Sequence, residues 1–338
     1  MAQRKRGKQS FCLENHPVIT AWASIAGKKE SEGPLASKFD ITRSDTKFGQ
    51  CSWEQAERKM QELALKTLTQ KAGMEMNELD LVFSGDLLNQ CIGSSFTLRN
   101  TGIPHIGLYG ACSTMAESLM LASLAVDAGI AERVAAMTSS HFASSERQYR
   151  FPLGYGGQRT PTAQWTVTGS GAVLVCSAGK GPRLESATVG TVTDLGITDA
   201  NNMGAAMAPA ALATIRAHFE DLNTGPEDYD LIVTGDLGQV GKEALLALAR
   251  LEGLCLGGKL VDCGTLVFDA QKQDVHSGGS GCGCSAITLC AELLPKLREG
   301  KLKKILFCGT GALLSPTSTQ QGLPIPGVCH AVCITGGQ

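Results

Sequence analysis

The sequence predicts an α/β protein made of two similar halves, and three repeated patterns support this. The first is an apolar run entered through Asp and left through Gly-Asp, at residues 79–86 and again at 229–236. The second is a Cys-Ser pair that begins a helical stretch, at Cys112 and at Cys284, each followed by a charged pair and an apolar run. The third is a closing apolar run, at residues 172–176 and 328–334. Alternating strands and helices of this kind are typical of α/β layers around mostly parallel sheets.

The elements of the first half follow one another from residue 52 onward. Ser52-Trp53-Glu54-Gln55 resembles a capping box and predicts a helix that ends near Gly73. A strand at 79–84, a helix from Cys112 to near Gly129 and a strand at 134–138 come next. Residues 139–168 are rich in Arg, Tyr, Gly and Pro and predict a long irregular segment before a strand at 172–176. A loop of that length in a compact domain is usually functional or disordered.

The second half is predicted to begin at Gly179-Lys180-Gly181-Pro182. This boundary gives an N-terminal half of residues 1–178 and a C-terminal half of residues 179–338. Pro209 suits the first position of a helix, because proline has a fixed backbone angle and no N–H to satisfy there. A strand at 231–234, a helix at 241–252, a strand near 265–268 and a last helix from Gly283 to near Gly300 complete the half.

Composition limits the class of protein. The chain has 338 residues, 43% of them hydrophobic, a net charge of −2 and no dense basic block after Arg4-Lys5-Arg6, which argues against nucleic acid as a partner. Its 13 cysteines are odd in number, and no apolar leader follows the charged start. No stretch reaches the roughly 18 apolar residues of a transmembrane helix. We therefore expect reduced thiols and an intracellular protein without a signal peptide or transmembrane helix.

Cys112 is the sharpest candidate for chemistry. It follows Gly-Ala at a predicted helix start, where free N–H groups and the helix dipole favour a thiolate. The alternative is a small buried cysteine, one among thirteen. Catalysis by a thiolate also needs a base or an electrophilic partner. His141 and His276, both in predicted loops after strands, are the histidines that could serve.

The predicted loop suggests anion binding instead. Arg147, Arg150 and Arg159 lie close together in it, interleaved with Tyr149 and Tyr155. Guanidinium groups bind carboxylates bidentately, and tyrosine can cover a flat ring. A solvated surface loop is the alternative. Phosphate-loop and dinucleotide motifs are absent from the sequence, and its cysteines lack the paired spacing of a zinc site, so no metal or cofactor is expected.

The repeated halves with their Cys-Ser helix starts resemble the thiolase superfamily and its β-ketoacyl synthase III branch, in which Cys112 matches the nucleophile position. The sequence resembles one member family more closely, the stage V sporulation protein AD family. The matching phrases run along nearly the whole chain: Gly85-Asp86-Leu87-Leu88-Asn89-Gln90, Gly110-Ala111-Cys112-Ser113-Thr114, Thr166-Val167-Thr168-Gly169-Ser170-Gly171-Ala172, Asp194-Leu195-Gly196-Ile197-Thr198-Asp199, Gly278-Gly279-Ser280-Gly281-Cys282 and Thr310-Gly311-Ala312-Leu313-Leu314-Ser315-Pro316.

The resemblance implies a thiolase-like fold, an α-β-α-β-α sandwich, and by default a homodimer. It also implies a sporulation role in binding dipicolinic acid for uptake into the developing spore, beside membrane proteins of the same operon at the spore inner membrane. It does not imply a condensing enzyme. The synthases carry a histidine where this sequence reads Gly235-Asp236-Leu237-Gly238, and their catalytic asparagine aligns with His276, a possible remnant partner of Cys112.

The leading hypothesis is therefore a non-catalytic protein whose former active-site cleft holds pyridine-2,6-dicarboxylate. The expected ligand-binding residues are Cys112, His141, Arg147, Arg150, Tyr155, Arg159 and His276. A dianion would need the arginines, whereas a neutral calcium chelate would depend on stacking and N–H donors, with calcium arriving as part of the ligand. Two alternatives stay open: a Cys112-dependent acyltransferase or condensing enzyme, and a structural adaptor of a spore membrane channel.

Overall fold

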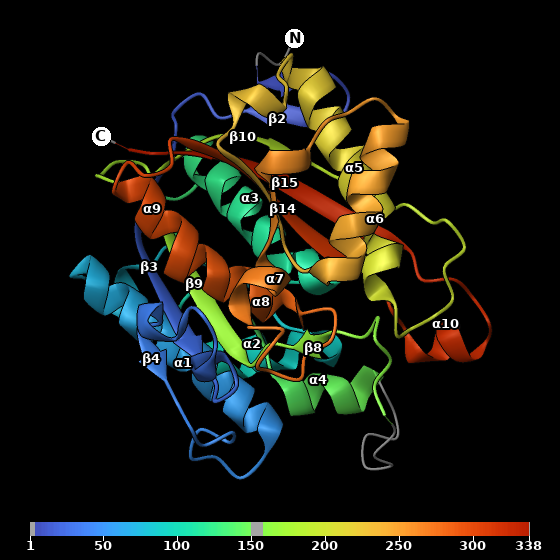
Figure 1. Ribbon diagram of the computed structural model, residues 1–338. Coiled ribbons are helices and arrows are strands. Elements are labelled where there is room, and N and C mark those ends of the chain that lie inside the picture. The colour runs from blue at the N-terminus through green and yellow to red at the C-terminus, as the bar shows by residue number, and fades with distance from the viewer. Residues whose placement is uncertain (1–3, 150–157, 338) are drawn as a thin grey trace.

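The computed structural model describes residues 4–149 and 158–337, and it has a mixed sheet covered by helices (Figure 1). The main strand path falls into two sets of five. The N-terminal set comprises β3 (Val18–Ala26), β5 (Leu81–Gly85), β6 (His105–Leu108), β7 (Arg133–Ser140) and β9 (Gly169–Cys176). The C-terminal set comprises β10 (Arg183–Thr188), β11 (Leu231–Thr234), β12 (Leu260–Asp262), β14 (Lys304–Ala312) and β15 (Gly327–Thr335).

Both sets have the same strand order. From the centre outward it is β3-β9-β7-β5-β6 on one side and β10-β15-β14-β11-β12 on the other. A single residue pair, Arg183 with Val18, joins the two sets. Each set mixes parallel pairs, such as β5 with β7, and antiparallel pairs, such as β7 with β9. The sheets are therefore mixed rather than mostly parallel, because the first and last strands of each half run against their neighbours.

Helices form the other layers of the α-β-α-β-α arrangement. Helix α3 (Thr114–Asp127) and the continuous run α8 (Cys282–Thr288), η9 (Leu289–Leu293) and α9 (Leu294–Arg298) share one core with strands of both halves. Helix α1 (Trp53–Ala72) packs on the N-terminal sheet, with α2 (Ile92–Leu98) beside it. Helices α5 (Met203–Leu222) and α6 (Gly238–Leu251) cover the C-terminal sheet. No helix within residues 4–149 and 158–337 is long and apolar enough to span a membrane.

Helix α1 shows how the sequence specifies an element. The Ser52 hydroxyl accepts a hydrogen bond from the backbone N–H of Gln55 at 3.3 Å, so one free helix N–H is satisfied. Met60, Leu65 and Leu68 are buried against the sheet. Gly73, at φ +66°, ends the helix in the left-handed region that glycine adopts without strain. The predicted start and end of this helix are thus confirmed.

Short elements connect the two halves of the chain. Strand β8 (Trp165–Thr166) pairs with β13 (Gly279–Ser280) in a separate parallel ribbon. Helix α4 (Phe142–Tyr149) precedes β8, and α7 (Cys263–Val267) lies ahead of β13. The remaining short elements lie at the rim: β1 (Lys5–Arg6), β2 (Ser10–Cys12), β4 (Ile41–Thr42) and α10 (Pro316–Gln320).

Three sequence-based expectations are corrected by the structure. Residues 139–168 are not wholly irregular, because α4 occupies 142–149, where the His141 ring nitrogen Nδ1 accepts the Ala143 N–H. Residues 265–268 are not a strand; β12 lies earlier, paired with β11, and α7 follows. Pro209 does not begin a helix. Helix α5 starts at Met203, capped by the Asn202 side chain, and carries the proline inside it.

Candidate functional site

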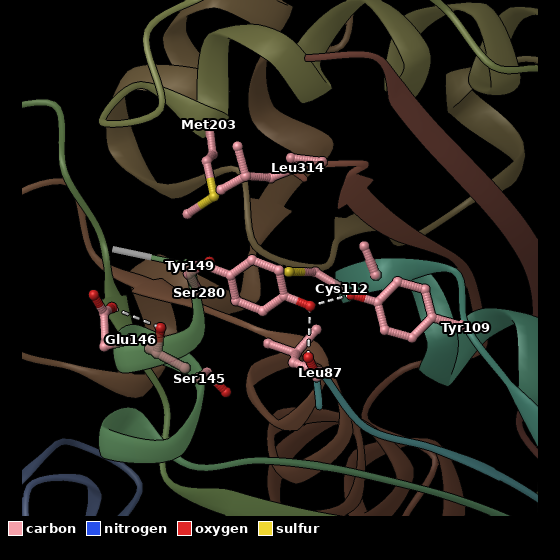
Figure 2. A pocket seen from close by; sticks show the side chains of 12 residues that line it. Leu87, Tyr109, Cys112, Ser145, Glu146, Tyr149, Met203, Ser280 and Leu314 are labelled. Carbon is pink, nitrogen blue, oxygen red and sulfur yellow. Dashed lines mark hydrogen bonds between the residues drawn. The ribbon is translucent and has the colours of Figure 1, made fainter. Parts of the chain in front are cut away.

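Cys112 lies on a short turn, η5 (Ala111–Ser113), between β6 and α3. Ala111 holds φ +51°, a conformation that costs a non-glycine residue free energy and so marks a constrained turn. The Cys112 side chain is 6% exposed and borders a small cavity, here called the Cys112 pocket (Figure 2). Its wall includes Leu87, Tyr109, Glu146, Tyr149, Met203 and Ser280, which come from both halves of the chain.

Asp236 is the polar partner of Cys112. Its buried carboxylate accepts hydrogen bonds from the Thr310 hydroxyl at 2.8 Å and the Gly281 N–H at 2.8 Å, and it lies close enough to Cys112 to act on the thiol. Burial, together with the nearby Asp236 charge, raises the pKa of the Cys112 thiol well above its usual value. The expected thiolate is therefore corrected to a protonated thiol, because desolvation and the carboxylate outweigh the helix N-terminus.

The repeated Gly-Asp phrase places a buried acid at the end of each matching strand. Asp86 follows β5, and its carboxylate accepts the Ser94 N–H at 2.8 Å and the Ser94 hydroxyl at 2.7 Å. Asp236 follows β11 at the equivalent place in the other half. Burial raises the pKa of both carboxyl groups. The phrase that predicted the duplication thus also carried a site residue, Asp236, whose role the sequence did not reveal.

Two tyrosines close the Cys112 pocket. The hydroxyls of Tyr109 and Tyr149 are hydrogen-bonded to each other, and the Tyr149 hydroxyl donates to the Leu87 carbonyl at 2.6 Å (Figure 2). Burial raises the pKa of Tyr109 to about 12, so its hydroxyl stays protonated. The cavity that remains has a volume of about 40 Å³. Such a volume has room for about one water molecule, so a larger ligand can bind only if the Tyr109 and Tyr149 side chains move apart.

Two polar side chains of α4 also line the Cys112 pocket. Glu146 accepts a hydrogen bond from the Thr166 hydroxyl at 2.8 Å. The Ser145 hydroxyl is buried and has no hydrogen-bond partner among the described residues. A buried hydroxyl without a partner is costly, and it indicates a position where a ligand atom or a water is needed. Neither residue was expected from the sequence, because the helix that carries them was not predicted.

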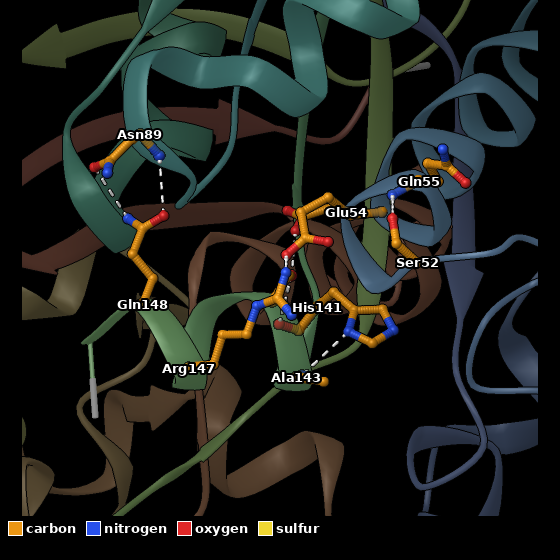
Figure 3. Close-up of polar contacts among 10 residues, drawn as sticks. Ser52, Glu54, Gln55, Asn89, His141, Ala143, Arg147 and Gln148 are labelled. Atoms are coloured by element: carbon orange, nitrogen blue, oxygen red, sulfur yellow. Dashed lines mark hydrogen bonds and ion pairs between the residues drawn. The ribbon is translucent and has the colours of Figure 1, made fainter. Parts of the chain in front are cut away.

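The two histidines lie apart from Cys112. The His141 ring donates from Nε2 to the Thr46 carbonyl at 2.7 Å. Its Nδ1 accepts the Ala143 N–H (Figure 3). Burial lowers the pKa of His141, in keeping with a neutral ring. The His276 Nε2 atom lies 3.3 Å from the Asp274 Oδ1 atom, and His276 is not part of the Cys112 pocket wall. Ser280 is the residue of this segment that lines the pocket.

The described arginines do not reach the Cys112 pocket wall either. Arg147 forms an ion pair with Glu54 (Figure 3). Its guanidinium lies 5.5 Å from the centre of the Trp53 ring. Arg159 lies 5.0 Å from the centre of the Trp165 ring. Arg150 and Tyr155 lie outside the described residues. The predicted anion-binding residues that are described therefore gather around two tryptophans.

Those tryptophans border a second cavity, here called the tryptophan pocket. Its wall includes Trp53, His141, Phe142 and Trp165, and its volume is about 510 Å³. Within the described part of the chain, no group of three or more His, Cys, Asp and Glu side chains is placed to hold a metal ion.

Comparison with known proteins identifies the family. The family model described as "Stage V sporulation protein AD (SpoVAD)" matches residues 7–335. The chain belongs to the stage V sporulation protein AD family. The stage V sporulation protein AD of Bacillus subtilis (strain 168) is 46% identical over 326 residues, which cover 96% of each chain. Membership of the stage V sporulation protein AD family supports a role in sporulation.

Solved structures agree with the expected thiolase-like fold. The 3-oxoacyl-[acyl-carrier-protein] synthase III of Aquifex aeolicus has a TM-score of 0.56 at 16% identity, covering 94% of this chain and 99% of its own. Cerulenin-bound OleA of Xanthomonas campestris has a TM-score of 0.62 at 14% identity, covering 96% and 97%. The synthase III FabH of Xanthomonas oryzae has a TM-score of 0.60 at 14% identity, covering 96% and 100%. This chain therefore shares the fold of these enzymes.

Proposed function

We propose that this chain is a non-catalytic binding protein for dipicolinic acid and serves its uptake into the developing spore. The observation that carries the proposal is the environment of Cys112. Its thiol is buried near the Asp236 carboxylate, and no Lys, Arg or His side chain lies among the described residues of the pocket wall. Nucleophilic catalysis needs an activated thiolate with a base or an oxyanion-stabilising partner, and Asp236 favours the opposite protonation state.

The pocket wall favours the calcium chelate over the free dianion. A dianion needs cationic partners when it leaves water, whereas the one-to-one chelate is neutral. Dipicolinate leaves calcium positions open, because the ion takes about 6–8 oxygen ligands. The Glu146 carboxylate and the Ser145 hydroxyl offer such oxygens. The Tyr109 and Tyr149 rings offer flat surfaces for the pyridine ring.

Entry of the ligand requires the Cys112 pocket to open. Tyr149 is the last residue of α4, and its hydroxyl is held by the Leu87 carbonyl and by Tyr109. Rotation of this one side chain would break both hydrogen bonds and enlarge the cavity. Calcium would then arrive with the ligand rather than as a resident cofactor.

Isothermal titration with dipicolinate, with and without calcium, tests the proposal, with pyridine-2-carboxylate as the monocarboxylate control. Adjacent residues of α4 provide a matched pair, because Glu146 lines the Cys112 pocket and Arg147 does not. We expect Glu146→Gln to weaken binding of the calcium chelate about tenfold, since a lost charged ligand costs about 1.4 kcal/mol or more. Arg147→Ala should leave that affinity within about twofold.

The opposite pattern would contradict binding of the calcium chelate in the Cys112 pocket. If calcium lowered the affinity and Arg147→Ala reduced it more than Glu146→Gln, the free dianion would bind outside the Cys112 pocket, near Arg147. Absence of heat with either form would remove dipicolinate as the ligand.

The acyltransferase alternative is tested at Cys112 itself. The raised pKa of the thiol predicts that acyl-CoA does not acylate Cys112 and that Cys112→Ala keeps ligand binding. Mass spectrometry of the intact protein after incubation with acyl-CoA measures acylation. Titration calorimetry measures ligand binding by Cys112→Ala. Rapid stoichiometric acylation of Cys112 would instead support an enzyme.

The adaptor alternative concerns partners. We propose that the protein acts at the surface of the spore inner membrane, beside membrane proteins encoded in the same operon. A chain that binds those proteins but neither form of dipicolinate would be an adaptor without a ligand.

A further inference from the structure

The tryptophan pocket is separate from the Cys112 pocket, and β8 and α4 form the wall between them. Side chains of successive strand residues point to opposite faces. In β8, Trp165 borders the tryptophan pocket and Thr166 borders the Cys112 pocket. In α4, Phe142 at the start of the helix borders the tryptophan pocket, and Tyr149 at its end borders the Cys112 pocket. The two cavities therefore lie on either side of β8 and beside opposite ends of α4.

Flat aromatic rings supply much of the tryptophan pocket wall. The Phe142 and Trp165 rings are stacked, with centroids 3.9 Å apart and an angle of 13° between their planes. Phe142 therefore covers one face of the Trp165 indole, and Lys29 and Arg159 also lie over this ring. Trp53, the first residue of α1, contributes a second indole. Such walls match a ligand with a flat apolar body.

Cations lie over both indoles. The Lys29 ammonium is 4.0 Å from the Trp165 ring centre, and the Lys47 ammonium is 5.9 Å from that of Trp53. Arg147 and Arg159 add a guanidinium over each ring. Within the described residues, Lys28, Lys29 and Lys47 form no ion pair with a carboxylate. Cation–π contact holds an ammonium in place without neutralising it, so these charges remain available to an anion.

One buried acid completes the pocket wall. Glu30 is 1% exposed, its Oε1 accepts the Thr168 N–H at 2.9 Å, and its Oε2 has no hydrogen-bond partner among the described residues. Burial raises the pKa of Glu30 to about 7. A neutral carboxyl group can donate a hydrogen bond to a carboxylate, which gives the unpartnered oxygen a role when a ligand is present.

We infer that the tryptophan pocket is a second small-molecule site and that it binds a planar aromatic carboxylate. The ring of the ligand lies against the Trp53 indole, and its carboxylate pairs with Lys29, beside Trp165, and the neighbouring cations. A cavity of about 510 Å³ is within the size range of small-molecule sites. This site stands independently of the proposed function, because it shares no binding residue with the Cys112 pocket.

The three tryptophans of the chain make the site directly observable. Protein labelled with 5-fluorotryptophan should show one fluorine signal for each, assigned with single Trp→Phe variants. Benzene-1,3-dicarboxylate is the probe, because it has the shape of dipicolinate but no ring nitrogen for calcium. We expect saturable shifts of the Trp53 and Trp165 signals. The Trp22 signal should stay fixed, because that ring is buried beneath Arg298.

Matched variants distinguish binding in the tryptophan pocket from binding in the Cys112 pocket. Lys29→Ala should weaken the probe about tenfold, while Lys301→Ala, which removes a lysine paired with Glu299, should not. Glu30→Gln keeps a donor without a charge and should leave binding equal or tighter. Glu146→Gln should leave the fluorine shifts unchanged even though it weakens the calcium chelate, so failure of one site is distinguishable from failure of the other.

Three results would overturn the inference. The Trp53 and Trp165 signals could fail to move with the probe. Glutarate, a flexible dianion, or inorganic phosphate could produce the same shifts at the same concentrations, which would mean that charge alone is recognised. Lys29→Ala could bind the probe as well as the unaltered chain.

Discussion

At the scale of single residues, buried acids distinguish this protein. Glu57 accepts hydrogen bonds from the hydroxyls of Ser139 at 3.0 Å and Ser144 at 2.8 Å. Burial, with Asp86 nearby, raises the pKa of Glu57 to about 8 from its usual 4.5. The folded state therefore binds more protons than the unfolded state between these values, and stability must fall as the pH rises through that range.

Glu57→Gln tests this linkage. The variant cannot ionise at that position, so its Tm should fall less than that of the unaltered chain between about pH 5 and pH 8. A difference of several degrees at the upper end is expected, since about 1 kcal/mol moves Tm by about 2–4 °C in large domains. Differential scanning fluorimetry across pH measures it.

Glu299→Gln is the control for that experiment. Glu299 is on the surface, and Lys301 lowers its pKa, so it is ionised in both states over the whole range. Equal pH slopes for Glu57→Gln and the unaltered chain would contradict the role of Glu57.

At the scale of elements, patterns within one element were predicted well and contacts between elements were not. The capping box at Ser52 and the apolar run at 231–234 depend on neighbours in sequence, and both elements lie where predicted. Helix α4 was missed because its N-terminus depends on the His141 ring and its buried face on residues far away, such as Glu57. The strand predicted at 265–268 lies instead at β12, residues 260–262. This difference also depends on a contact between elements, because β12 is defined by its pairing with β11.

In the candidate site, too, the residue with a local sequence pattern was predicted and its distant partners were not. Cys112 was found from its local Gly-Ala-Cys-Ser setting, whereas its partner Asp236 comes from the other half of the chain. The prediction that aromatic and basic residues of 139–168 bind an anion stays a prediction, and the described arginines Arg147 and Arg159 lie beside tryptophan rings. Their association with Trp53 and Lys29 could not be predicted, because it requires the packing of α4 against α1 and β8.

At the scale of the whole molecule, the open edge of the N-terminal sheet suggests an interface. Strand β6 ends the strand order, so one side of its backbone has no strand partner among the described residues. Ile106 on β6 is 48% exposed and Phe96 on the adjacent α2 is 43% exposed. An exposed apolar edge strand is a template for pairing with another chain, and we propose that a second copy covers it.

Ile106→Lys tests the proposed homodimer. A charge at the edge should convert a dimer into a monomer, measured by sedimentation at micromolar concentration. Ile130→Lys is the matched control, because Ile130 is 76% exposed in the loop after α3. A monomeric unaltered chain, or a dimer that survives Ile106→Lys, would contradict an interface at β6.

Strand β8 has a consequence for how the family can vary. It is two residues long, with Trp165 on one cavity and Thr166 on the other. A one-residue shift of its pairing with β13 would move both side chains to the opposite faces, and so would damage two cavities at once. Insertions and deletions in relatives should therefore occur before Ala163 and be absent from residues 164–166. The position of β8 can then be used to align distant sequences.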